Sequence, residues 1–162
     1  MIVNLPSGVK CFEINTNYDQ RGMTYEIFRD DNNEYININM GYLSWTLPKQ
    51  SRGPHEHSEQ SDLFIFAGPG TFELCLWDIR HVNTDELTVE LAKEIKFTYI
   101  VGESNKVKLS IPPGIVHGYK NISEIPGLVL NFPDELYRGW KKGVPPDEKK
   151  WELEKDNPFL ML

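Results

Sequence analysis

The feature that most constrains the fold is a series of short segments in which apolar and polar residues alternate. Alternation with a period of two is typical of β-strands that bury one face. The segments are GVKCFEI (8–14), TYEIFR (24–29), EYININMGYLSW (34–45), DLFIFAGPGTFELCLWDI (62–79), KEIKFTYIV (93–101), KVKLSI (106–111), GIVHGYK (114–120) and GLVLNF (127–132). The fourth holds two strands joined across Gly68-Pro69-Gly70, where glycine supplies the backbone freedom of a tight turn. Many short strands at this spacing predict an all-β sandwich or barrel of the jelly-roll kind.

Two segments depart from this pattern. TDELTVELAKEI (84–95) contains strong helix formers, but TVELA alternates like its neighbours, so we expect a strand there. The last thirty residues are charged and broken by proline, and we expect them to pack as a short helix or an ordered tail. No repeat, low-complexity stretch or linker interrupts the sequence, which predicts a single domain over residues 1–162.

Composition narrows the classes of partner. Apolar residues make up 40% of the chain, but no apolar run approaches the ~20 residues of a membrane span. The net charge of −7 comes without a basic stripe, which disfavours a nucleic-acid partner. The N-terminus lacks the pattern of a signal peptide, and Cys11 and Cys75 lie outside any CxxC pair. We therefore expect a cytoplasmic protein. Within the fourth alternating segment (62–79), we expect Phe64, Phe66, Phe72 and Leu74 to lie in the hydrophobic core of the protein.

Two stretches carry the chemistry. RGPHEHSEQSD (52–62) places His55 and His57 two residues apart, so on a strand both side chains point to one face. PPGIVHGYKN (112–121) has the form PxGxxHxxxN around His117. Together the stretches resemble the two motifs of the cupin superfamily, with Asp62 at the acidic position of the first motif. That resemblance implies a cupin jelly-roll barrel, or double-stranded β-helix, with the histidines inside its mouth.

A closer resemblance is to the dTDP-4-dehydrorhamnose 3,5-epimerase family. Its ordered motifs match RGMTYEIF (21–28), RGPH (52–55), WDIR (77–80), IPPGIVHGY (111–119) and ELY (135–137). The RGxHAH motif of the related nucleotide-sugar 3,4-ketoisomerases is also similar to residues 52–57. The resemblance implies a homodimer that transfers protons next to the ketone of a 4-keto-6-deoxy sugar nucleotide and needs no cofactor.

The same resemblance implies roles for single residues. His55 matches the general base, and Asp147 is a candidate to orient that base. The second proton could come from Tyr137, Tyr119 or His57. Histidine suits a base because its ordinary pKa is about 6.5. The substrate-binding positions fall on Arg21, Glu26, Arg52, Gln60, Arg80, His117, Tyr119 and Asn131. Arg21 and Glu26 also fit a simple cross-strand ion pair.

Three departures from the family favour a ketoisomerase or a single epimerase over a double epimerase. The family's lysine is replaced by Asp62, its thymine-stacking aromatic falls on Thr24, and its opposite-face tyrosine falls on Asn131. An asparagine side chain is not a general acid at neutral pH.

Two other hypotheses stay open on sequence alone. His55, His57, Asp62 and His117 form a donor set that suits Zn, Fe, Mn or Ni, which would make the chain a metal-dependent cupin oxygenase or isomerase. The chain could also be a sugar-binding cupin without catalysis, because the lysine and the tyrosine are missing. A binder would tolerate loss of His55 with a modest change in affinity, whereas an isomerase would lose turnover.

Overall fold

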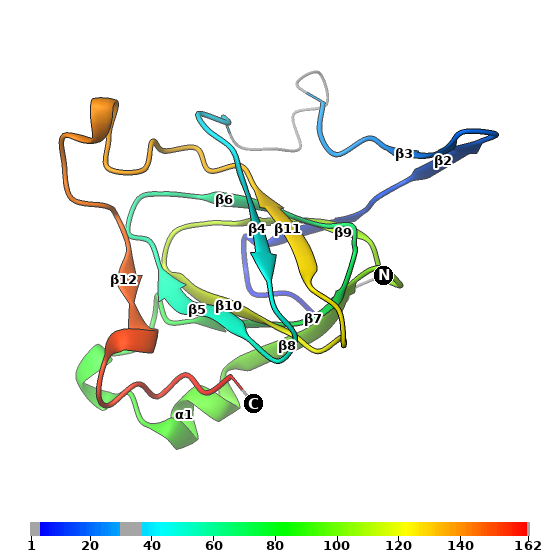
Figure 1. Cartoon of the computed structure of the whole chain (residues 1–162). Coiled ribbons are helices and arrows are strands. Elements are labelled where there is room, and N and C mark those ends of the chain that lie inside the picture. Colours follow the sequence, from blue (N-terminus) through cyan, green and yellow to red (C-terminus); the bar gives the residue numbers. More distant parts are fainter. Residues whose placement is uncertain (1–3, 30–36, 162) are drawn as a thin grey trace.

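Two five-stranded antiparallel sheets face each other and form a barrel in the computed structural model, which describes residues 4–29 and 37–161 (Figure 1). The first sheet runs β1 (Lys10–Glu13), β9 (Val107–Ile111), β6 (Asp62–Phe66), β11 (Gly127–Asn131) and β4 (Tyr42–Thr46). The second runs β12 (Lys149–Lys150), β5 (Ser51–Glu56), β10 (Ile115–Asn121), β7 (Thr71–Asp78) and β8 (Lys96–Gly102). A separate hairpin, β2 (Thr16–Asp19) and β3 (Gly22–Tyr25), projects from the barrel. The expected all-β jelly roll is confirmed.

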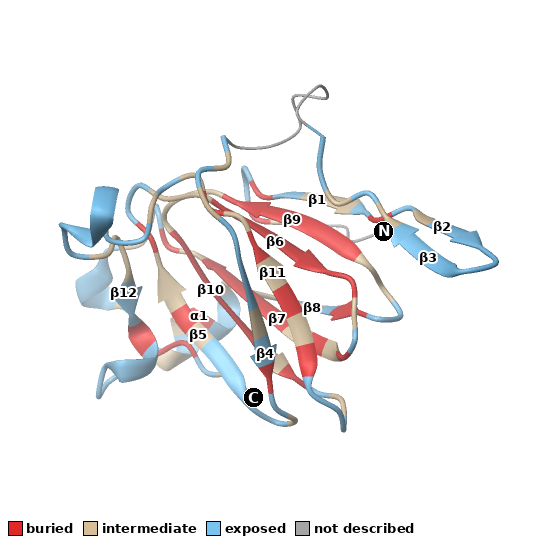
Figure 2. Ribbon diagram, turned by 45° about the horizontal axis from the view of Figure 1, so that its top comes forward, coloured by how far each residue is buried: buried red, intermediate tan, exposed pale blue. Residues whose placement is uncertain are grey.

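The core lies between the two sheets, where the alternating apolar residues of both meet (Figure 2). Phe64, Phe66, Phe72 and Leu74 are all buried there, as the alternation predicts. The first sheet is also covered on its outer face, because Leu63 and the segment after β3 form a second apolar cluster. β6 is therefore buried along its whole length.

The strand predicted over residues 84–95 is wrong. This segment forms a 3₁₀ turn, η2 (Thr84–Glu86), and a short helix, α1 (Val89–Glu94). The Thr88 hydroxyl accepts a hydrogen bond from the Leu91 backbone N–H at 3.1 Å, which caps the helix. Ala92 then packs into the apolar cluster that contains Trp77. A capped helical turn satisfies these backbone groups locally, so the alternation did not produce a strand.

Two other expectations need adjustment, and the expectation of an ordered C-terminal tail is confirmed. Within the predicted strand 34–45, residues 34–36 lie outside the described residues and the strand β4 is Tyr42–Thr46. The strand predicted over 24–29 is displaced, because β3 ends at Tyr25. The tail is ordered and holds short 3₁₀ helices, η3 (Trp140–Lys142) and η4 (Trp151–Leu153), as well as β12. None of the helices within residues 4–29 and 37–161 has the length and apolar character needed to span a membrane.

Candidate active site

β5 and β10 bring two motif histidines face to face. His55 and His117 are register partners, and a bulge follows in which Tyr119 pairs with Arg52. Gly53 allows this close approach, because its φ is 76° and a Cβ there would lie 2.6 Å from the His117 carbonyl oxygen. The RGPH motif therefore needs glycine at position 53, because a larger residue would clash with the paired strand β10.

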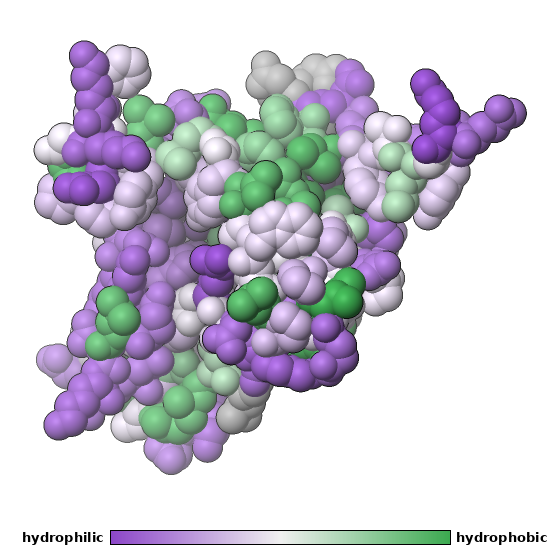
Figure 3. All heavy atoms as spheres, in the orientation of Figure 1, coloured by the Kyte–Doolittle hydropathy of each residue, from purple (hydrophilic) through white to green (hydrophobic). Residues whose placement is uncertain are grey.

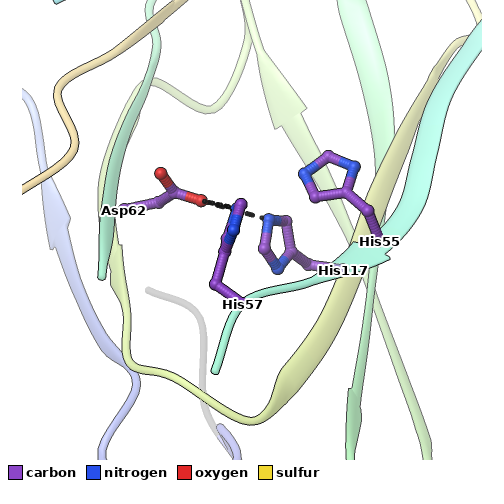
Figure 4. A group of neighbouring side chains, drawn as sticks. All are labelled: His55, His57, Asp62 and His117. Atoms are coloured by element: carbon purple, nitrogen blue, oxygen red, sulfur yellow. Dashed lines mark ion pairs between the residues drawn. The ribbon is translucent and has the colours of Figure 1, made fainter. Parts of the chain in front are cut away.

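Four side chains converge at this point (Figure 4). The His55 and His117 rings lie 4.4 Å apart between centroids, and His57 lies 5.5 Å from His55. Asp62 Oδ2 lies 3.2 Å from His57 Nε2 and 3.3 Å from His117 Nε2. The four potential ligand atoms all lie within 4.8 Å of one another, so the sequence motifs do form one cluster.

Backbone carbonyl groups fix two of the three imidazoles. His57 Nδ1 donates to the carbonyl oxygen of Asp147, and His117 Nδ1 donates to that of Ile115 at 2.9 Å. Each Nε2 atom is thereby turned toward Asp62. The His57 and His117 side chains are both almost fully buried, so the protein holds these rings in one orientation.

Two amides fix the carboxylate from the other side. Gln60 Nε2 donates to Asp62 Oδ1 at 3.0 Å, and Asn131 Nδ2 donates to the same oxygen at 2.8 Å. Burial alone would raise the pKa of the Asp62 carboxyl, but His117 and His57 hold it well below its usual range. Burial likewise disfavours the charged His57 ring, yet the hydrogen bond and charge of Asp62 raise the pKa of His57 above its ordinary value.

His55 is held differently. It is half-buried, and its ring makes no hydrogen bond with any described residue. Burial, together with the neighbouring His117 and His57 rings, lowers the pKa of His55 well below its ordinary value. At neutral pH this imidazole is therefore uncharged and has a lone pair available for a proton or a metal ion.

His55 faces a cavity of about 850 Å³, a size suited to a small-molecule ligand. Figure 3 shows a hollow beside the barrel, with hydrophilic residues along it. A smaller chamber of about 480 Å³ lies on the other side of His55 and shares Tyr42, Glu148 and Lys150 with the large one. His55 therefore stands where the two spaces meet.

Two relatives of known families are similar enough in sequence to show the family of this chain. The chain is 34% identical over 131 residues to a probable low-salt glycan biosynthesis epimerase, Agl13, of Haloferax volcanii, covering 80% of this chain and 79% of that protein. It is 30% identical over 149 residues to the spore coat polysaccharide biosynthesis protein SpsL of Bacillus subtilis, covering 91% of each. The chain belongs to the family of these glycan and polysaccharide biosynthesis proteins, one of which is a probable epimerase. No protein-family model matches it.

Solved structures of epimerase-like cupins share the fold. A dTDP sugar isomerase from Desulfovibrio desulfuricans superimposes with a TM-score of 0.73 at 21% identity, covering 96% of this chain and 90% of that one. A dTDP-4-dehydrorhamnose 3,5-epimerase from Sulfolobus tokodaii does so with a TM-score of 0.69 at 22% identity, covering 91% and 78%.

The structure gathers most of the residues that the epimerase-like motifs single out. His55, His57, Gln60, Tyr137 and Asp147 line the large cavity. Arg52 and Tyr119 line the smaller chamber. His117 and Asn131 lie behind the cavity, where each faces Asp62.

Asp147 acts on the loop after His57. Its carboxylate accepts hydrogen bonds from the backbone N–H groups of Ser58, Glu59 and Gln60 at 2.7–3.0 Å. Burial tends to raise the pKa of this carboxyl, but the three N–H groups lower it below its ordinary value. The residue therefore orients His57 through its carbonyl group and holds the adjoining loop through its side chain.

Three candidates lie outside both chambers. Arg21 pairs at 2.5 Å with Asp19 on the exposed hairpin. Glu26 pairs with Arg29 at 3.6 Å. The Arg80 guanidinium donates to the Asp78 carboxylate at 2.5 Å, and also to a backbone carbonyl of the N-terminal segment. The structure therefore shows two local ion pairs in place of the Arg21–Glu26 pair that the sequence also allowed.

Sequence reasoning missed Tyr42. This residue lines both chambers, and its hydroxyl accepts a hydrogen bond from Asn131 Nδ2 at 2.9 Å. No motif covers position 42. The available signal was the alternation of β4, which places Tyr42, Ser44 and Thr46 on the face opposite Leu43 and Trp45.

Proposed function

We propose that this protein is a nucleotide-sugar epimerase or isomerase that moves a proton next to the ketone of a 4-keto-6-deoxy sugar nucleotide. The observation that carries the proposal is His55, an uncharged imidazole that makes no hydrogen bond with the described residues and lines both chambers. Membership of an epimerase-like family supports it. So does a solved neighbour of the same fold, the Legionella pneumophila epimerase in complex with dTDP-4-keto-L-rhamnose.

The chemistry follows from the acidity of a C–H bond beside a ketone. His55 takes the proton, and the electron pair of the C–H bond moves into an enolate. General-base catalysis of this kind contributes about 10²–10⁴-fold to the rate.

Arg52 is placed to bind an anionic oxygen of the substrate. Its guanidinium donates to Thr46 Oγ1 at 3.0 Å and to the Trp45 carbonyl at 2.9 Å. A guanidinium has five N–H donors in a planar fork, so further donors remain for the smaller chamber. We assign the diphosphate or the ketone oxygen to this group.

Solvent exchange tests the proposal. The protein is incubated in D₂O with a dTDP-linked 4-keto-6-deoxyhexose, and the sugar is followed by mass spectrometry and NMR. We expect deuterium to enter at a carbon beside the ketone, and none to enter dTDP-glucose, which has no ketone. A keto sugar nucleotide that stays fully protonated across a panel of sugars and nucleotides would contradict the proposal.

A second candidate function rests on how protons and charge are balanced between the histidines and Asp62. Each Nδ1–H is donated to a carbonyl, so the Nε2 atoms of His57 and His117 present lone pairs to the Asp62 carboxylate unless a second proton is bound. While each of these rings carries its single proton on Nδ1, Asp62 Oδ2 and His117 Nε2 are buried and have no hydrogen-bond partner among the described residues. His57 Nε2 can accept an N–H of Gln60 at 3.2 Å, so Asp62 Oδ2 and His117 Nε2 are the pair that remains opposed, and a second proton on an imidazole or a divalent cation would balance it.

The donor set fits a transition metal. His55, His57, Asp62 and His117 would hold Zn, Fe, Mn or Ni, and the carbonyl groups on Nδ1 are the outer partners that such ligands need. A metal bound there would supply a Lewis acid for the ketone or enolate oxygen. The chain would then be a metal-dependent isomerase or oxygenase.

Metal content separates the two functions without an activity assay. Elemental mass spectrometry is applied to untagged protein after incubation with each of the four metals and removal of excess metal. Near-stoichiometric metal that is lost in both His57→Ala and Asp62→Ala supports the metal function. Retention of no metal by the wild type eliminates it.

The outer face of β4 supports a homodimer. Leu43, Trp45 and Leu47 are 58%, 53% and 63% exposed, and β4 is an edge strand of its sheet. Figure 3 shows hydrophobic spheres over this face. We propose that a second copy covers it, since a dimer also protects the free edge. Sedimentation should give a dimer, and Trp45→Glu should give a monomer.

We also propose a cytoplasmic location, because Cys11 and Cys75 are both free thiols, as is usual in a reducing compartment.

A further inference from the structure

The cavity has two walls made by different sheets. His55 comes from β5 of the second sheet, and Tyr42 comes from β4 of the first. Both side chains line the large cavity and the smaller chamber. A planar enolate held between these walls would therefore present one face to His55 and the other to Tyr42. Inversion of a carbon centre needs that arrangement, because the proton leaves from one face and returns on the other.

The Tyr42 hydroxyl is held in a defined place. Tyr42 and Asn131 are register partners on β4 and β11. Asn131 Nδ2 donates to Tyr42 Oη at 2.9 Å and to Asp62 Oδ1 at 2.8 Å, and Asn131 is 1% exposed. The phenol oxygen is thus an acceptor in this contact, and its own O–H has no acceptor among the described residues. That O–H is free to point at a ligand.

The other two tyrosines near the cavity are less suited to the task. Tyr119 lies on β10, in the same sheet as His55, and its hydroxyl is hydrogen-bonded to Ser44 Oγ at 2.9 Å. Tyr137 lines the large cavity, but its hydroxyl makes no hydrogen bond with the described part of the chain, so that hydroxyl is not held in place. Tyr42 alone among the three combines an opposite wall with a fixed hydroxyl.

We propose that Tyr42 is the second catalytic residue, which delivers a proton to the face of the enolate opposite His55, and that the reaction is therefore an epimerisation. The inference rests on the proposed function. Burial raises the pKa of Tyr42 to about 12, against the lowering effect of Asn131, so the phenol carries its proton at neutral pH.

The step balances without a co-reactant. His55 removes the proton beside the ketone, and the C–H electron pair becomes part of the enolate. The enolate carbon then takes the Tyr42 proton on its other face, which restores the ketone and inverts the centre. The phenolate regains a proton from water and the imidazolium loses one to water, so the net change is one substrate hydrogen exchanged with solvent.

The substitution Tyr42→Phe separates inversion from exchange. In D₂O, His55 can still remove a proton, exchange it with solvent and return deuterium to the same face. We expect inverted product to fall by about 10²-fold or more, with KM little changed. Deuterium should continue to enter the substrate that keeps its configuration. Tyr18→Phe is the matched control, because Tyr18 lies on the projecting hairpin and is 75% exposed.

Three outcomes would overturn the inference. In the first, Tyr42→Phe inverts the sugar at the wild-type rate. In the second, Tyr42→Phe loses both inversion and exchange while its melting temperature matches that of the wild type. In the third, the wild type isomerises the ketone without inverting any carbon. Failure of the proposed function itself looks different, because the wild type then exchanges no hydrogen of any keto sugar nucleotide.

Discussion

Within one cluster, the protein holds His57 and His117 in a different way from His55. His57 and His117 each donate to a backbone carbonyl and meet the same oxygen of Asp62. His55 lies beside them with no hydrogen bond to its ring among the described residues, and it faces the cavity. The difference teaches that position in a shared motif does not fix a role. The tethered groups maintain the shape of the site, whereas the free ring is available for chemistry.

Removal of the free ring should have the largest effect. We expect His55→Ala to reduce turnover on a keto sugar nucleotide by up to about 10⁴-fold, because the base is gone. The unfolding free energy should change little, since no hydrogen bond of the ring is lost. Steady-state kinetics and urea denaturation check this, with His81→Ala as the control at an exposed histidine. Turnover within a few-fold of wild type would contradict the assignment of the chemistry to His55 rather than to His57 and His117.

Removal of the carboxylate should act mainly on stability. Asp62→Ala leaves a buried imidazole of raised pKa and two amide donors without their acceptor. Breaking a buried pair of this kind costs about 3 kcal/mol. Urea denaturation at pH 7 measures the loss, and Asp85→Ala, at an exposed carboxylate, is the control. An unchanged urea midpoint would mean that the contacts of Asp62 with His57 and His117 do not stabilise the site.

The outer support should have a smaller effect that depends on pH. Asp147→Ala removes the acceptor of three backbone N–H groups and should cost about 1–2 kcal/mol. Because the folded pKa of Asp147 is lowered, its contribution is fully present above about pH 4. The contribution is lost as the pH falls through the folded pKa. Denaturation curves of mutant and wild type should therefore converge in acid, and a gap that is constant with pH would contradict this origin.

A substitution away from the cluster should matter least. Arg80 pairs with Asp78 near the surface, so Arg80→Ala should reduce stability by less than about 1 kcal/mol. The loss should shrink in high salt, because exposed ion pairs are screened. A larger loss, independent of salt, would show that Arg80 supports more than its local turn.

Sequence predicted the parts of the site that depend on periodicity and motif. The HxH spacing and the second motif placed His55 and His117 together, and strand pairing explains why. It could not predict the tethers, because the partners of His57 and His117 are backbone carbonyls that no side-chain pattern encodes. Tyr42 was missed for a similar reason, since its role depends on register with a strand almost ninety residues later. The helix α1 was missed because a single threonine cap outweighed local alternation.

The measurement that tests the central claim most directly is hydrogen exchange after metal removal. The protein is treated with chelator, shown by elemental mass spectrometry to be free of transition metal, and incubated in D₂O with a dTDP-linked 4-keto-6-deoxyhexose. If His55 acts as a base without a metal, deuterium enters beside the ketone at the rate of the untreated protein. Exchange that stops on chelation, and returns only when Zn, Fe, Mn or Ni is restored, would contradict the account and assign the cluster to a metal.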